Sequence, residues 1–211
     1  MAGWCIQDVI GQPANEALSV DELGAMQAAL QQVSPLSDQD IDALLAHAKR
    51  VPLPKGTVLL RAGEAAQTTG FVLSGGLREY YVLDDGTERT KGFNLAGGFA
   101  GSLSDLISGA ASRVWIVAEA PSVLVNTPWP VYAELTESRP AWARFARKMA
   151  EALYMAKVER EYELLALDAA QRYQRLLTRW PTLEAVFSQR DIASYIGVTP
   201  VHLSRLRSSK A

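Results

Sequence analysis

The stretch "QRDIASYIGVTPVHLSRLR", residues 189–207, predicts two short helices joined at a glycine. Ser188 followed three residues later by Asp191 is the pattern of a capping box, so we expect the first helix to begin directly after Ser188. Gly197 allows the left-handed turn that ends this helix. The Thr199-Pro200 pair is favoured at the N-cap and first position of a second helix. This order of signals predicts a helix-turn-helix.

The apolar residues of the stretch support this interpretation, because they fall where two crossing helices have to touch. Those expected to pack together are Ile192, Ala193, Ile196, Val198, Leu203 and Leu206. Ala193 is small, as close helix packing requires. In proteins that bind DNA with this motif, the second helix enters the major groove with its N-terminus first.

The residues expected to contact DNA lie on the exposed face of the second helix and at the helix N-termini. They are Ser188, Gln189, Thr199, Pro200, Val201, His202, Ser204, Arg205 and Arg207. We expect Arg205 to bond a guanine in two places and Val201 to contact a thymine methyl. Ser188, Gln189 and Thr199 are better placed for phosphates. His202 is expected to be a surface or phosphate contact, and Arg207 and Lys210 to add an attraction that salt weakens.

The distribution of charge agrees with a polyanionic partner. The net charge of the chain is −2, but from Asp168 to the end seven Lys and Arg residues face three Asp and Glu residues, which gives +4. The rest of the chain therefore carries −6. A basic terminal unit of this kind is typical of a nucleic-acid-binding region.

Before this unit, three regions differ in composition. Residues 1–35 predict a helix capped by Ser19 and Glu22, and a second helix begins after Ser37 and ends before Pro52. From about Lys55 to Asn126, short β-rich runs alternate with glycines, and "GLREYYVLDDGTERTKGF" carries the hairpin signal Asp85-Gly86. Many short strands without intervening helices predict an antiparallel barrel, sandwich or jelly roll.

A long helix is predicted between the β-rich region and the basic unit, over residues 139–167. Apolar residues recur along it at steps of three or four, namely Trp142, Phe145, Met149, Leu153, Ala156 and Leu164. This stripe has to be buried on the β-region, on a partner helix, or on both. We expect it to form the seam of a dimer.

This order of elements resembles the bacterial Crp/Fnr transcription regulators. The segments "GTVLLRAGE", "FVLSGGLREYYVLDDGTE" and "GGFAGSLSDLISG" follow the family's order, and the likeness extends from about Ser37 to Lys210. The resemblance implies an α+β protein with an N-terminal helical extension (1–35), a cyclic-nucleotide-binding-like β-roll (36–135), a dimerisation helix (136–167) and a DNA-binding domain (168–211). It further implies a homodimer that binds double-stranded promoter DNA and recruits or blocks RNA polymerase.

The ligand pocket that the resemblance implies would be built from Gly101, Ser102, Leu103, Ala111, Ser112 and Arg113. Members of the family that bind cyclic AMP carry Gly-Glu-Leu where this chain has Gly-Ser-Leu, and an arginine where it has Ala111. Arg113 lies two residues later, about 7 Å along a strand, unless the alignment slips. It could instead form a salt bridge at the rim, for example to Asp105. The predicted long helix also has no Ser or Thr between Arg139 and Leu167, whereas hydroxyls from this helix read adenine in such proteins. Cyclic AMP is therefore disfavoured, and the effector is a different anionic or apolar ligand or none.

Other cofactors of the family fit poorly. Oxygen-sensing members need several cysteines for a cluster, and this chain has one, Cys5. Haem-sensing members need axial ligands, whereas His47 and His202 fall on predicted helices. We therefore predict no metal and no cofactor. Only residues 208–211 follow Arg207, too few for a two-stranded wing, so the sequence predicts a helix-turn-helix that lacks a full wing, either naturally or through shortening.

Composition limits the class of protein. At 48% hydrophobic and 21% charged residues the chain is globular, and no apolar run reaches the ~20 residues of a membrane span. The start "MAGWCIQDVI" lacks a secretory signal, and a single cysteine suits the cytoplasm. No catalytic triad, metal-ligating histidine cluster or phosphate-binding glycine loop is present, so we do not expect an enzyme. The alternative is a ligand-sensing module whose terminal helices bind protein rather than DNA.

Overall fold

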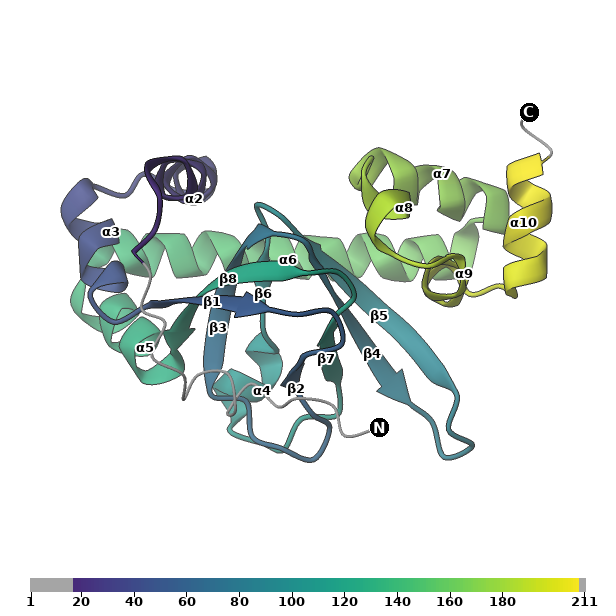
Figure 1. The fold of residues 1–211 in the computed structure, drawn as a ribbon, viewed down its shortest axis with the longest axis horizontal. Coiled ribbons are helices and arrows are strands. Elements are labelled where there is room, and N and C mark those ends of the chain that lie inside the picture. Colours follow the sequence, from purple (N-terminus) through teal and green to yellow (C-terminus); the bar gives the residue numbers. More distant parts are fainter. Residues whose placement is uncertain (1–16, 209–211) are drawn as a thin grey trace.

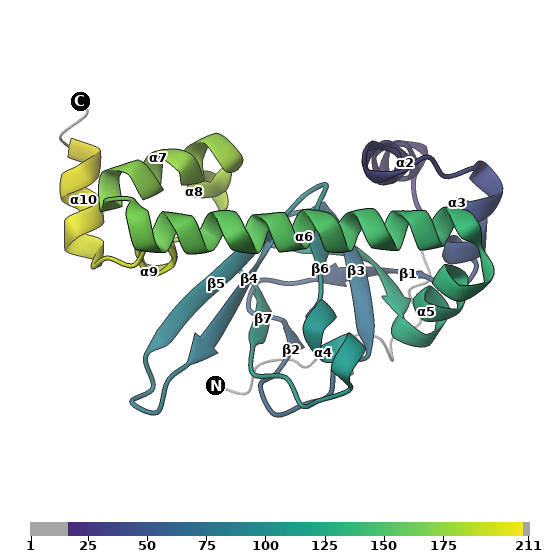
Figure 2. The same ribbon diagram turned by 180° about the vertical axis from the view of Figure 1, so that it is seen from behind.

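A 27-residue helix, α6 (Pro140–Ala166), runs along the whole molecule, and the other elements are arranged on it (Figures 1 and 2). The computed structural model describes residues 17–208. A β-roll lies against the middle of α6, with short helices at one end of it and a second group of helices at the other. This arrangement confirms the predicted α+β fold with an antiparallel roll, a long helix and a terminal helix-turn-helix.

The roll consists of two four-stranded antiparallel sheets, ordered β1-β8-β3-β6 and β2-β7-β4-β5. The strands are β1 (Lys49–Leu53), β2 (Val58–Leu60), β3 (Thr68–Ser74), β4 (Gly76–Val82), β5 (Glu88–Leu95), β6 (Phe99–Ala100), β7 (Trp115–Ala118) and β8 (Ser122–Pro128), with the short helix α4 (Leu103–Ser108) after β6. Apolar side chains from both sheets, among them Leu53, Leu77 and Ile116, fill the interior between them. The roll therefore has a core of its own.

The predicted hairpin is β4–β5. Gly86 has a φ of 77°, in the left-handed region that a residue with a side chain rarely adopts. The N–H of Thr87 donates to a carboxylate oxygen of Asp85 over 2.8 Å, which holds the turn closed. The Asp85-Gly86 signal thus marked the turn correctly.

The start of the β-region was predicted wrongly. The helix expected to continue to Pro52 ends as α3 (Asp38–Leu45), and residues 49–53 form strand β1 instead. Pro52 does not prevent this, because β1 is an edge strand and pairs only with β8. A proline is tolerated where no neighbouring strand needs its missing N–H group.

Helices α2 (Val20–Val33), α3 and α5 (Trp129–Ser138) cover the N-terminal end of α6 and the outer face of the roll. Both predicted capping boxes, Ser19 with Glu22 and Ser37 with Asp40, are formed. The indole N–H of Trp142 donates to the carbonyl oxygen of Asp40 over 3.0 Å, which ties α6 to α3. The part of the predicted N-terminal extension before residue 17 lies outside the described residues.

The stripe predicted as a dimer seam on α6 instead packs inside this chain at its N-terminal end. Trp142 and Phe145 are each 1% exposed and lie in one apolar cluster with Phe71 of the roll and Met26 of α2. Met149 is partly buried against the same cluster. These residues are consequently not free to contact a partner subunit, and the alternative of packing on the chain's own roll holds for them.

The C-terminal end of α6 leads into four helices, α7 (Ala169–Arg179), α8 (Leu183–Val186), α9 (Gln189–Ile196) and α10 (Pro200–Ser208). Asp168 caps α7 in a full capping box with Gln171. Buried apolar residues of all four helices form a third cluster, which also contains Phe93 of β5. We call α7–α10 the helical unit.

Candidate nucleic-acid interface

Helices α9 and α10 form the predicted helix-turn-helix. Gly197, which ends α9, has a φ of 77° and lies in the left-handed region. Thr199 caps α10, since its hydroxyl accepts from the N–H of His202 over 3.2 Å. Leu203 is fully buried and, together with Ile192, holds the two helices together. The helix-turn-helix predicted from these local signals is therefore confirmed.

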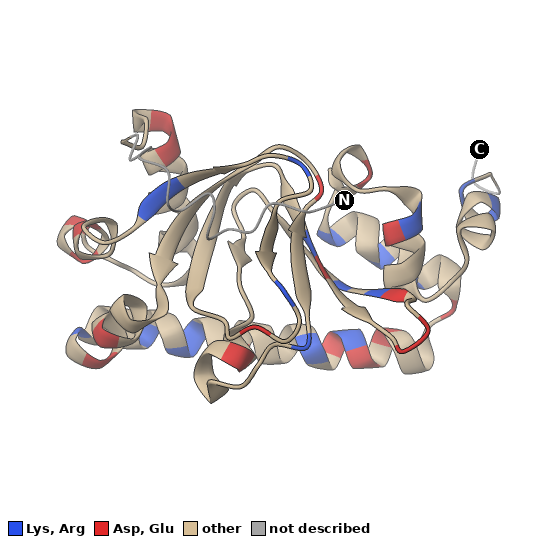
Figure 3. Ribbon diagram, turned by 60° about the horizontal axis from the view of Figure 1, so that its bottom comes forward, with Lys and Arg blue, Asp and Glu red and all other residues tan. Residues whose placement is uncertain are grey.

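The face of α10 that points away from α9 is open to solvent. All the residues that the sequence predicted to contact DNA are exposed, namely Ser188, Gln189, Thr199, Pro200, Val201, His202, Ser204, Arg205 and Arg207. No ion-pair partner of Arg205 lies within residues 17–208, whereas Nε of Arg207 is 3.5 Å from Oε1 of Glu184. Figure 3 shows the basic end of α10 at the periphery of the molecule. That these nine exposed residues contact DNA remains a prediction.

The N-terminal part of α10 and its cap Thr199 form a shallow hollow on the exposed face. Thr199, Val201, His202, Arg205 and Leu206 line this hollow. Val201 is 62% exposed, although it is apolar. Arg205 and Val201 lie together on this surface and suit the edge of a base pair. The guanidinium of Arg205 can donate to a guanine, and Val201 can contact a thymine methyl.

The helical unit is docked directly on the β4–β5 hairpin, which the sequence did not predict. The ring of Phe93 on β5 lies 4.4 Å from that of Phe187 and 5.3 Å from that of Tyr195, centroid to centroid. A Cβ atom on Gly76 of β4 would lie 2.7 Å from Val186 Cγ1, so only glycine allows this close approach. The orientation of α9 and α10 is therefore set by the roll.

A buried cluster of charges lies at the same interface. Arg78 of β4 is 7% exposed, and its guanidinium contacts Glu88 at 2.7 Å, Glu119 at 2.8 Å and Asp191 of α9 at 3.2 Å. Burial alone would lower the pKa of Arg78, but hydrogen bonds to Glu119 and Glu88 outweigh it and raise the pKa above its usual value. The Arg78 cluster thus links the roll to α9 by ionic contacts, and solvent screens these contacts little because Arg78 is buried.

The prediction for Asp191 needs a correction. Ser188 caps α9, as its hydroxyl oxygen accepts from the N–H of Asp191 over 3.2 Å. The Asp191 carboxylate, however, accepts from the Ser188 hydroxyl (2.6 Å) and pairs with Arg78, rather than accepting from the backbone N–H of Ser188. The reciprocal half of a capping box is thus replaced by a contact between domains.

The end of α6 holds the helical unit from a second side. Glu163 is 2% exposed and lies between the guanidinium groups of Arg160, at 3.4 Å, and Arg179 of α7, at 2.7 Å. Arg160 also lies over the ring of Tyr195 of α9, 3.9 Å from its centroid, and donates to the carbonyl oxygen of Tyr195. Together these contacts join α6, α7 and α9.

Opposite the roll, α6 exposes a row of large apolar side chains, which we call the outer stripe. Its members, with their exposed fractions, are Tyr154 (66%), Met155 (55%), Val158 (39%), Tyr162 (49%) and Leu165 (80%). Tyr154, Val158 and Leu165 are spaced by four and seven residues, so they lie on one face of the helix. Leu153 and Leu164 of the predicted stripe are also exposed, at 40% and 49%, but the sequence analysis did not single out the residues of the outer stripe.

The residues of the expected ligand pocket do not all point to one place. Ser102 and Ser112 are buried, while Ala111 and Arg113 are exposed. Gly101, with a φ of 137°, passes close to the backbone of Thr68, and Leu103 begins α4. The suggested salt bridge between Arg113 and Asp105 is not formed, and within residues 17–208 no carboxylate pairs with Arg113.

A carboxylate and serines occupy the centre of this expected pocket. Asp105 is half-buried, which by itself would raise its pKa, but hydrogen bonds from Ser102, Ser112 and Ser104 hold the pKa below its usual value. Asp105 is consequently ionised at neutral pH. Three serines and an aspartate within "SLSD" and "ASRV" are the sequence signal for this arrangement, which the sequence analysis did not predict.

Lys91, whose charge acts on Asp105, is already paired. Nζ of Lys91 on β5 lies 2.8 Å from Oε2 of Glu79 on β4, and the amide of Asn94 donates to the other oxygen over 3.0 Å. Burial acts to lower the pKa of Lys91, but the charge of Glu79 keeps it above the usual value. The arrangement offers a phosphate no uncommitted buried cation within the described chain.

Within residues 17–208, no group of three or more His, Cys, Asp and Glu side chains could hold a metal ion. No helix in this range is both long and apolar enough to cross a membrane.

Known proteins match both the sequence and the fold. A family model described as the cyclic nucleotide-binding domain matches residues 50–139. The chain is 26% identical over 173 residues to the fumarate and nitrate reduction regulatory protein of Vibrio cholerae, a match that covers 75% of this chain and 67% of that protein. Its counterpart in Escherichia coli K12 is 24% identical over the same length.

Among solved structures, FixK2 from Bradyrhizobium japonicum superimposes with a TM-score of 0.67 at 22% identity, covering 77% of this chain and 83% of that one. The regulator CLP of Xanthomonas campestris, described as responsive to c-di-GMP, gives a TM-score of 0.64 at 20% identity, with 82% and 91% covered. At these identities the structures establish the shared fold. The curated relatives are regulatory proteins.

Proposed function

We propose, from the premise that this chain belongs to the Crp/Fnr family of regulators, that it is a transcription regulator that reads DNA with α10. One observation carries this proposal, namely a capped and rigidly docked helix-turn-helix whose reading face is exposed. Arg205 supplies base recognition, and Arg207 and the N-termini of α9 and α10 supply phosphate contacts. Regulation would occur in the cytoplasm through recruitment or blocking of RNA polymerase.

Arg205→Ala should lower affinity for a selected genomic fragment by about 10- to 100-fold, because a two-point contact with guanine contributes ~1–3 kcal/mol. Affinity for unrelated DNA should fall by only about twofold, since a single exposed charge is lost. Electrophoretic shifts of both fragments measure the two effects, after selection of bound fragments from genomic DNA.

Arg113→Ala is the matched control, because Arg113 is exposed on the roll and carries the same charge. It should leave both affinities unchanged. Equal losses on all sequences in Arg205→Ala would remove the base-reading role from that residue. Retention of no DNA even at low salt would favour the alternative, in which the terminal helices bind protein.

Two copies of the chain are expected to act together. The outer stripe of α6 supplies the apolar surface that a parallel partner helix would cover. A two-fold axis along this seam gives two copies of α10, and thus a palindromic site with half-site centres ~34 Å apart. Dimerisation through this stripe is part of the proposal.

The proposed regulator does not respond to cyclic AMP. The ionised Asp105 would repel the cyclic phosphate, and the buried Lys91 is already paired with Glu79. Cyclic AMP at ~1 mM should therefore leave the thermal unfolding midpoint unchanged, whereas a ligand at 100 times its Kd would stabilise the fold by ~2.7 kcal/mol. A saturable rise in the midpoint that is lost in Arg113→Ala would show instead that Arg113 reaches the phosphate.

A further inference from the structure

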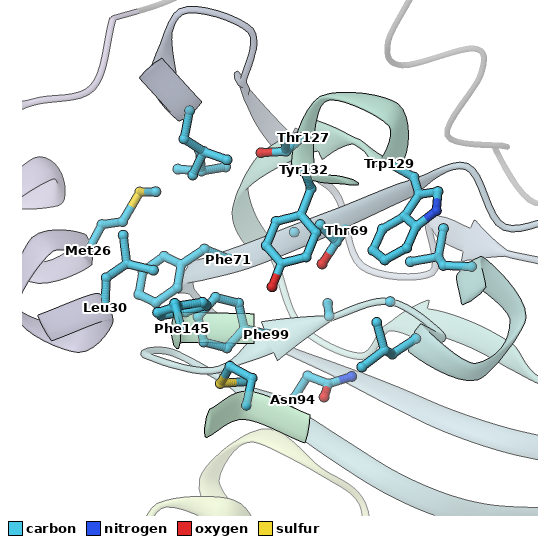
Figure 4. A pocket seen from close by; sticks show the side chains of 18 of the residues that line it. Met26, Leu30, Thr69, Phe71, Asn94, Phe99, Thr127, Trp129, Tyr132 and Phe145 are labelled. Atoms are coloured by element: carbon cyan, nitrogen blue, oxygen red, sulfur yellow. The ribbon is translucent and has the colours of Figure 1, made fainter. Parts of the chain in front are cut away.

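A cavity of about 150 Å³ lies between the outer face of the roll and helices α2, α5 and α6. Its walls include Phe71 of β3, Met26 of α2, Tyr132 of α5 and Phe145 of α6, as Figure 4 shows. The predicted ligand pocket borders it only through Gly101 and Leu103. The cavity thus borders the segment around Asp105, through Leu103 and Leu106 as well, but Asp105 itself does not line it.

The polar groups at this cavity are few, and they differ in whether they are already engaged. Glu79 and Asn94 border one end, but they are bonded to each other, and Glu79 also to Lys91. The hydroxyl of Tyr132 points toward the space that Thr69 and Phe99 border, and within residues 17–208 it has no hydrogen-bond partner (Figure 4). Tyr132 therefore offers an uncommitted hydrogen-bond donor in a wall that is mostly apolar.

Burial keeps this donor protonated. Loss of solvation raises the pKa of Tyr132 to about 12, so the phenol carries its proton throughout the physiological range. Within residues 17–208 no group accepts from this hydroxyl, so an occupant of the cavity that carries an acceptor oxygen would supply its partner. Apolar walls also disfavour ordered water, which needs two or more polar partners.

The size of the space limits the occupant. An apolar cavity of ~150 Å³ in other proteins stays dry and accepts a molecule the size of benzene. Charged molecules are excluded, since the walls could not replace their hydration. Leu103 of α4, which is partly exposed, and Leu153 of α6, which is 40% exposed, both line the cavity and reach the surface.

We propose that this cavity is a binding site for a compact, uncharged ring molecule that carries one hydroxyl or carbonyl oxygen, which accepts a hydrogen bond from Tyr132. Met149 of α6 lines the same cavity, and α6 carries the outer stripe on its opposite side. The site thus lies against the helix that joins the sensor region to the helical unit. Binding itself does not depend on the DNA-binding function proposed above.

The test uses 4-fluorophenol and fluorobenzene as probes, with binding to the full chain followed by 19F NMR titration. Both should bind saturably in a single site. Tyr132→Phe should weaken 4-fluorophenol by about fivefold and leave fluorobenzene within about twofold, because only the first loses a hydrogen bond. Thr69→Leu fills the cavity, and it should abolish binding of both probes while leaving the unliganded unfolding midpoint unchanged or raised.

Each outcome decides the matter. Failure of both probes to saturate, or unchanged binding in a folded Thr69→Leu variant, would overturn the site. Equal effects of Tyr132→Phe on both probes would overturn the role of the hydroxyl and with it the assigned ligand class. The expected pattern separates a hydrogen bond from simple filling of an apolar space, which a purely structural role of Tyr132 would not reproduce.

Discussion

Replacing Val158 and Leu165 with glutamate should convert a dimer into a monomer and reduce affinity for a palindromic site by at least about 100-fold. Both side chains lie on the outer stripe, 39% and 80% exposed, and neither belongs to an apolar cluster of the described chain. Two charges on each helix would face two on its partner, and their desolvation has no compensating pair. Simultaneous contact of two half-sites raises affinity by ~10²–10⁴, and a monomer loses this gain.

Size-exclusion chromatography with light scattering measures the first effect, and fragment binding the second. Glu161 and Lys157 of the same helix are already charged and exposed, so Lys157→Glu is a suitable control that should remain dimeric. The monomeric variant should remain folded and unfold in a single transition, since neither substitution changes the core of the roll. An unchanged dimer in the double variant would place the seam elsewhere.

Arg78→Leu should destabilise the protein by ~3–5 kcal/mol, the usual loss when one member of a buried ion cluster is removed. Three carboxylates, from Glu88, Glu119 and Asp191, would then lie near one another without a cation. Leucine retains much of the apolar packing, so the effect would report the charge. Urea unfolding measures it, and proteolysis should cleave the helical unit faster.

Arg89→Leu is the matched control on the neighbouring strand, because Arg89 is exposed. Its effect should stay within about 0.5 kcal/mol. Asp191→Asn removes the ionic contact between β4 and α9 while two carboxylates still pair with Arg78, so it should cost less than Arg78→Leu. Equal stability of the Arg78 and Arg89 variants would contradict a structural role for the Arg78 cluster.

The helix-turn-helix could be predicted because its determinants are local. A cap at Ser188, a left-handed Gly197 and a Thr199-Pro200 start each act within a few residues, and the structure contains all three. The roll followed from similar local turn chemistry, as at Gly86. Such signals need no knowledge of what packs on them.

The errors occurred where a distant segment decides the outcome. Periodicity showed that one side of α6 is apolar, but not that Trp142 would be covered by α2 and α3 of the same chain. Alternation along β4 could not show that Arg78 would face Asp191, which is 113 positions later in the chain. Likewise, the sequence suggested Arg113 as a partner of Asp105, but it did not indicate that Ser112 would bond to this carboxylate.

The docking of the helical unit on β5 has a consequence for experiments on its parts. Phe187 and Tyr195 each owe part of their burial to Phe93, a residue outside residues 168–211. An excised C-terminal fragment would expose these rings to water. It would therefore tend to self-associate and would be unsuitable for measuring DNA binding. A fragment meant to keep the native packing of the helical unit should therefore include the β4–β5 hairpin.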